Sequence, residues 1–118
     1  ACRNPYVRHI AHPTGRIIGR RPGYEPNIEK LAQLAEETNT ILEINANPKR
    51  LDLNTQTVRQ YPNVKLTINT DAHHVDHLEF MKYGVATAQK GFVNKERVIN
   101  TMTKEAFRSF VETNKYKK

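Results

Sequence analysis

Three short apolar segments, separated by two helix-like segments, constrain the fold of this chain more than any other feature of its sequence. Segments 7–11, 40–46 and 64–69 have the composition of strands, and segments 28–38 and 55–60 between them have the composition and end signals of helices. Strands that alternate with helices form parallel sheets with right-handed crossovers. The sequence therefore predicts an α/β fold built from parallel β/α units.

Side chains that favour helix ends mark the boundaries of the expected helices. Asn27 and Asn54 are placed as N-caps, and Asn39 is placed to end the first helix. Gly84 is expected to end a helix that begins at Val75, after the third strand. Further helices are expected in three later segments: 85–89, 96–102 and 104–113.

The composition is that of a soluble, globular, single domain. Hydrophobic residues make up 37% of the 118 residues and charged residues 26%, and no apolar run is long enough to span a bilayer. A single cysteine excludes an internal disulfide bond and favours a reducing, cytoplasmic compartment. The aromatic side chains are expected in the core: Tyr24, Tyr61, Phe80, Tyr83, Phe92, Phe107 and Phe110.

A net charge of +7 predicts an acidic partner, with phosphate groups as the best match. Part of this charge lies in the tail 115–118, which is expected to be a frayed, solvated end. Four loop cations are candidates for binding phosphate, because a guanidinium or ammonium group can bind its oxygens. Structural salt bridges and plain solvated charge are the alternatives for these residues: Arg16, Arg20, Lys49 and Arg50.

Polar residues follow each predicted strand. His12 follows the first, Asn45 and Asn47 end the second, and Asp71 and His73 follow the third. The carboxyl ends of parallel strands meet at one edge, so these side chains are expected to lie close together. Residues two apart in an extended segment point the same way, and a carboxylate with an imidazole suits zinc, manganese or iron. The sequence therefore predicts a metal site at this edge.

Each candidate has a structural alternative. His12 could instead be a buried, hydrogen-bonded histidine, and Asp71 could cap the helix that follows it. Capping of their own loop is the alternative for the two asparagines of the second strand end. Four residues are expected to support the ligands rather than bind the metal directly: Glu43, Asn45, Asn47 and His74.

Three motifs in order, residues 12–16, 43–53 and 68–73, closely resemble the polymerase-and-histidinol-phosphatase (PHP) domain. The match is closest to the PHP domain at the carboxyl end of bacterial family X DNA polymerases, and it covers nearly the whole chain. The resemblance implies a distorted (βα)7 barrel that holds a cluster of divalent metal ions at its carboxyl-end face. It also implies that His12, Asp71 and His73 are metal ligands.

The activity implied by this resemblance is a metal-dependent 3′–5′ exonuclease or phosphodiesterase that acts on DNA in repair. Mn²⁺ is the implied metal, with Zn²⁺ and Mg²⁺ as alternatives. Such ions lower the pKa of a bound water towards about 7 and neutralise charge on the phosphoryl oxygens. Arg16, with Lys49 and Arg50, is expected to bind the flanking phosphates.

The chain departs from the family pattern because the family's opening His-x-His motif, its bridging glutamate and a further histidine have no counterpart in it. Residues 1–118 are therefore expected to be the carboxyl-terminal portion of a PHP domain, with upstream PHP and polymerase regions as partners. Three alternatives remain: a phosphomonoesterase of the histidinol-phosphatase type, an inactive DNA-binding or structural segment, and a homodimer that pairs exposed strand edges.

Overall fold

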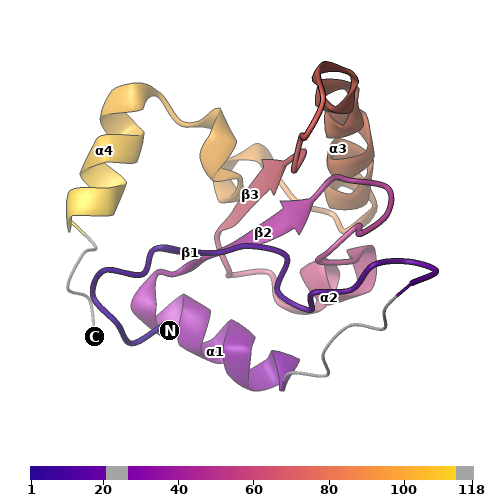
Figure 1. The fold of residues 1–118 in the computed structure, drawn as a ribbon. Helices are drawn as coiled ribbons and strands as arrows, with labels where there is room; N and C mark the ends of the chain where they lie inside the picture. The colour runs from indigo at the N-terminus through magenta and orange to yellow at the C-terminus, as the bar shows by residue number, and fades with distance from the viewer. Residues whose placement is uncertain (21–26, 114–118) are drawn as a thin grey trace.

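The computed structural model describes residues 1–20 and 27–113, so Tyr24 and the tail 115–118 lie outside the described residues. The described part contains a three-stranded parallel sheet in the order β1-β2-β3 (Figure 1). The strands are β1 (His9–Ile10), β2 (Ile41–Asn45) and β3 (Leu66–Asn69). The predicted α/β class with parallel strands is confirmed, and the complete (βα)7 barrel stays a prediction.

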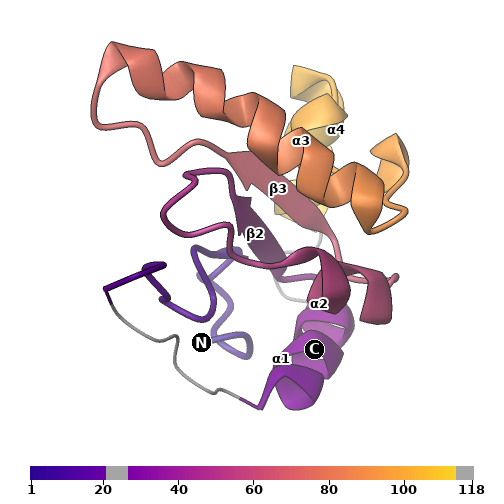
Figure 2. The same cartoon turned by 90° about the vertical axis from the view of Figure 1, so that its right-hand side faces the viewer.

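The helices differ in how closely they contact the sheet. Figure 2 shows α3 passing over β3, whereas α4 stands apart from the sheet in Figure 1. The strands are joined through α1 and α2, and short 3-10 helices flank α3. The bounds are α1 (Ile28–Thr38), α2 (Thr55–Gln60), η1 (Val75–Phe80), α3 (Met81–Lys90), η2 (Lys95–Arg97), η3 (Ile99–Thr101) and α4 (Lys104–Thr113).

One face of the sheet is apolar and carries the core. Successive strand residues point to opposite faces, so Leu42 and Ile44 of β2 share a face with Leu66 and Ile68 of β3. All four are buried, and α1, α2 and α3 contribute small or branched side chains to the same cluster. Burial of this apolar surface is the main stabilising term of the fold.

The other face of the sheet is polar. Glu43 pairs in register with Thr67, and Asn45 with Asn69. His9 joins this face through its Nε2 atom, which lies 2.7 Å from the Thr67 hydroxyl. Burial lowers the pKa of the His9 imidazole below its ordinary value, and the carboxylate of Glu43 opposes this effect. The polar face leads directly to the strand ends that carry the candidate site.

The predicted N-caps are confirmed. Asn27 Oδ1 accepts a hydrogen bond from the Lys30 N–H at 3.0 Å, and Asn54 Oδ1 accepts one from the Thr57 N–H at 2.9 Å. Asn39 ends α1 in the left-handed conformation with φ of 51°. These caps depend on residues close in sequence, and α1 begins and ends where the sequence predicts.

The prediction that Gly84 ends a helix is wrong. Segment 75–80 is the 3-10 helix η1, and α3 then continues through Gly84 to Lys90, including the segment 85–89. A Cβ atom at position 84 would lie 2.4 Å from Ile68 Cγ2 and 2.8 Å from Ala46 Cβ. Glycine is therefore required at this position, where α3 crosses closely over the sheet. A larger residue would block that contact, which explains why Gly84 lies within the helix rather than at its end.

The segment expected as a helix over 96–102 forms two separate 3-10 helices, η2 and η3. Arg97 is buried and donates hydrogen bonds to the carbonyl oxygens of Val58, Tyr61 and Val64. Asn100 pairs its side-chain amide with both backbone groups of Ile68 on the outer edge of β3. These side chains fix the segment against the sheet and the end of α2.

The prediction that the aromatic side chains lie in the core is also wrong for several of them. Phe92 is 74% exposed, and Tyr83 and Phe107 are exposed as well. Arg59 lies over the Phe92 ring at 4.6 Å from its centroid, so this ring contacts a cation at the surface rather than the core. Tyr61 and Phe80 pack against the core, as expected.

Candidate metal and phosphate site

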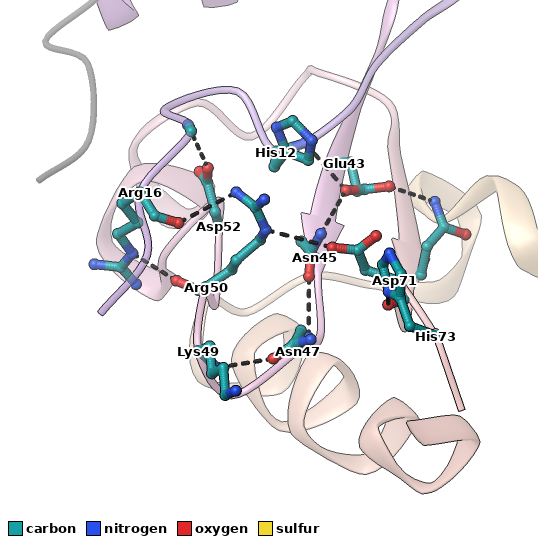
Figure 3. Close-up of polar contacts among 12 residues, drawn as sticks. His12, Arg16, Glu43, Asn45, Asn47, Lys49, Arg50, Asp52, Asp71 and His73 are labelled. Carbon is teal, nitrogen blue, oxygen red and sulfur yellow. Dashed lines mark hydrogen bonds and ion pairs between the residues drawn. The ribbon is translucent and has the colours of Figure 1, made fainter. Parts of the chain in front are cut away.

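The loops that follow the three strands come together at one edge of the sheet, as expected for parallel strands. Figure 3 shows His12, Glu43, Asn45 and Asp71 gathered at this edge, with Arg50 reaching between the loops. The convergence of the strand ends predicted from the sequence is therefore present. Which side chains face one another differs in part from the prediction.

Glu43 ties the three strand ends together. Its side chain is 6% exposed, and Oε1 accepts hydrogen bonds from the His12 backbone N–H at 3.0 Å and from Asn45 Nδ2 at 3.1 Å. Oε2 accepts a third bond from Asn69 Nδ2 at 2.9 Å. Neutral donors thus satisfy this buried carboxylate, and it fixes the backbone next to the His12 side chain.

Asn45 and Asn47 hold their own loop. Asn45 Oδ1 accepts a hydrogen bond from the Asn47 N–H at 3.0 Å, and Asn47 Oδ1 accepts one from the Lys49 N–H at 2.9 Å. These contacts match the alternative of loop capping. Asn45 also bonds to Glu43, so the same side chain connects this loop to the strand ends.

Arg16 and Arg50 bond to each other's backbone. Arg16 Nε donates to the carbonyl oxygen of Arg50 at 2.6 Å, and Arg16 Nη2 donates to that of Leu51 at 2.6 Å. In return Arg50 Nη1 donates to the Arg16 carbonyl oxygen at 3.4 Å. Arg16 therefore joins two loops through carbonyl oxygens rather than through the salt bridge given as its alternative. Arg20 and Lys49 are exposed.

Asp52 is an important residue of the site that the sequence did not single out. It is 1% exposed, and its Oδ2 accepts hydrogen bonds from the backbone N–H groups of Thr14 at 2.9 Å and Gly15 at 3.0 Å. Its position between Leu51 and Leu53 is the available signal, because a carboxylate that is buried with apolar neighbours must be paired or hydrogen-bonded. Asp52 fixes the turn that follows His12.

Asp71 forms an ion pair with a candidate phosphate-binding residue. Its Oδ2 lies 3.3 Å from Arg50 Nε, and its backbone adopts a φ of 54°. Asp71 does not take the alternative role of helix cap, since His74 Nδ1 accepts the bond from the Asp76 N–H at the start of η1. The carboxylate is thus left to interact with cations.

The three neighbouring histidines differ in which ring nitrogen is free. His73 Nδ1 lies 2.7 Å from the Asp71 carbonyl oxygen, so it carries the proton and leaves the lone pair on Nε2. His74 and His77 instead accept backbone N–H bonds at Nδ1, at 3.2 Å and 3.1 Å. A carbonyl that holds one nitrogen of an exposed imidazole is a common arrangement for metal-binding histidines. Only His73 of these three has it.

The donor types fit the implied metal, but their number does not. His12, Asp71 and His73 offer the imidazole nitrogens and carboxylate oxygen that Mn²⁺ and Zn²⁺ accept. Within residues 1–20 and 27–113, however, no three histidine, cysteine, aspartate or glutamate side chains are grouped so as to hold an ion. Among the described residues these side chains therefore do not complete a metal site, and His12, Asp71 and His73 stay predicted ligands.

The chain is similar to a bacterial DNA polymerase. It is 47% identical over 116 residues to the carboxyl-terminal part of the "DNA polymerase/3'-5' exonuclease PolX" of Bacillus subtilis. The resemblance to family X DNA polymerases is confirmed. The match covers 97% of the chain and only 20% of PolX, so the chain spans about one fifth of that relative. No family model matches the chain.

PolX is itself an enzyme that joins polymerase and exonuclease activities in one protein, by its name. The metal and phosphate roles of individual residues in this chain stay predictions. In the described part of the chain, no helix is both long and apolar enough to cross a membrane.

Proposed function

We propose that this chain contributes to a metal-dependent phosphodiesterase site that removes nucleotides from DNA as a 3′–5′ exonuclease. The observation that carries the proposal is the corner after β3, where the Asp71 carboxylate and the free Nε2 of His73 stand two residues apart. The name of the PolX relative supports the choice of DNA as substrate and of a 3′–5′ exonuclease as the activity.

His12, Asp71 and His73 would hold a divalent ion, Mn²⁺ in the first place, together with donors from the remainder of a longer polymerase. The ion would supply an activated water and would neutralise charge on the phosphoryl group. Glu43 and Asp52 keep the His12 loop in place through their bonds to its backbone. Arg50, Lys49 and Arg20 would bind the phosphates that flank the cleaved bond.

A net charge of +7 favours DNA over a small phosphomonoester. A long polyanion can contact many cations at once, whereas a small phosphate ester can contact only those beside the reacting group. The exposed Lys49 and Arg20 lie in the loops around the strand ends, where an extended substrate would pass.

The neighbouring histidines provide a matched test. We expect His73→Gln to weaken calorimetrically measured Mn²⁺ binding by at least about tenfold, and His74→Gln to leave it nearly unchanged, because His74 Nδ1 is bonded to a backbone N–H. The same two substitutions in the longer polymerase should separate in a Mn²⁺-dependent nuclease assay. Equal effects of the two substitutions, on binding and on cleavage alike, would contradict the proposal.

A further inference from the structure

The ion pair between Arg50 and Asp71 joins a predicted phosphate-binding residue to a predicted metal ligand. Arg50 Nε lies 3.3 Å from Asp71 Oδ2, and the two side chains are 18% and 29% exposed. Arg50 Nη1 is bonded to the Arg16 carbonyl oxygen. Nη2 has no partner among the described residues, so the guanidinium is only partly occupied by the protein.

This pair limits what either residue can bind. A carboxylate that already faces a guanidinium attracts a second cation less, and a guanidinium beside a carboxylate attracts an anion less. The pair is partly shielded from water, so this mutual neutralisation is stronger than at an open surface. Asp71 and Arg50 therefore each lower the affinity of the other for an outside ligand.

We propose that Asp71 masks Arg50 as a phosphate-binding residue, and that neutralising the Asp71 carboxylate releases Arg50 to bind a DNA phosphate. The inference rests on the proposed function, in which a cation is held by Asp71 and the substrate is a phosphodiester. Occupation of Asp71 by a cation and binding of DNA would then favour each other, since binding free energies are reciprocally linked.

The neighbouring contacts favour phosphate as the ligand of the released guanidinium. Lys49 is exposed next to Arg50, so a second positive charge is available to the same anion. Arg16 already donates from Nε and Nη2 to backbone carbonyl oxygens, so it has fewer free donors than the released Arg50 to offer a phosphate. The planar guanidinium can present two parallel donors to phosphate oxygens, which an ammonium cannot.

The experiment measures DNA affinity without any metal. A fluorescein-labelled single-stranded oligonucleotide is titrated with the chain in EDTA at one fixed salt concentration, and anisotropy is read. Asp71→Asn should tighten binding by about fivefold, because it removes a charge and also frees Arg50. Glu79→Gln removes one exposed carboxylate that has no ion-pair partner among the described residues, and it should tighten binding by about twofold.

A second pair of variants shows whether the gain passes through Arg50. In a chain that already carries Arg50→Gln, Asp71→Asn should increase the affinity for DNA by no more than Glu79→Gln does in the unaltered chain. The inference is overturned if Asp71→Asn increases DNA affinity no more than Glu79→Gln does, or if its larger increase persists in the Arg50→Gln chain. It is also overturned if no variant binds DNA. Failure of Mn²⁺ binding in the calorimetric test would instead count against the proposed metal site, since this readout contains no metal.

Discussion

Replacement of Arg97 by methionine tests whether one buried cation stabilises the connection between α2, β3 and η2. Arg97 is 8% exposed and donates to three backbone carbonyl groups, Val58, Tyr61 and Val64. Those of Val58 and Tyr61 belong to the carboxyl end of α2, where carbonyl groups lack helical partners. Methionine keeps most of the length of the side chain but donates nothing.

The expected cost follows from these contacts. A hydrogen bond from a charged donor contributes about 1.5 kcal/mol or more, so three of them are worth about 4 to 5 kcal/mol. Part of this is offset, because the guanidinium is unfavourably desolvated, and burial lowers the pKa of Arg97 to about 10. We expect a net loss of about 3 kcal/mol in the free energy of unfolding, or roughly 12 °C in Tm.

Urea denaturation followed by circular dichroism measures this loss, with an unchanged m-value showing that only stability has changed. Arg59→Met is the matched control, because Arg59 is an exposed arginine of α2 whose guanidinium lies over the Phe92 ring. It should cost about 0.5 kcal/mol. If Arg97→Met costs no more than Arg59→Met, the three bonds do not stabilise the chain and the reasoning is refuted.

Two further predictions concern the sheet. The pKa of His9 is lowered in the folded state, so the unfolded state binds more protons below about pH 6.5, and stability should fall as the pH drops through that range. His9→Gln should flatten this part of the curve of urea midpoint against pH, and an equally steep curve would exclude His9 as the cause. Gly84→Ala should destabilise the chain by about 2 kcal/mol, because its Cβ would collide with Ile68. A Cβ atom at Gly19 would meet no atom of the described residues within 4 Å, and its positive φ of 80° is the one source of strain. Gly19→Ala should therefore cost about 1 kcal/mol of stability. Equal costs at both glycines would contradict the packing argument.

The features that the sequence predicted correctly depend on neighbours along the chain. Asn27 and Asn54 cap helices through bonds to residues three positions later, so local composition sufficed. The predictions for Gly84 and for the segment 96–102 were wrong because both conformations depend on contacts with residues far away in sequence. A glycine that ends a helix and a glycine that permits close packing have the same local pattern, and only the sheet beside Gly84 distinguishes them.

In the candidate site, too, some features could be predicted from the sequence and others could not. The order of strands and polar motifs was enough to bring His12, Glu43 and Asp71 to one edge of the sheet. The sequence could not show that Asp71 faces Arg50, or that His73 and His74 have different ring nitrogens free. Such details depend on the turns that follow each strand, in particular on the left-handed backbone at Asp71.

The side chain of Asn100 occupies the outer edge of β3, so it determines at which edge the sheet can be extended. Its Oδ1 accepts from the Ile68 N–H and its Nδ2 donates to the Ile68 carbonyl oxygen, both at 2.8 Å, so one amide takes the place of a neighbouring strand. Val98 forms a bridge to Leu66 on the same edge. Within the described sheet β1 is the opposite edge strand, so a strand from another molecule would join beside β1. Two copies that pair β1 with β1 would use the same surface and form a closed dimer, whereas an open fibre would need both edges.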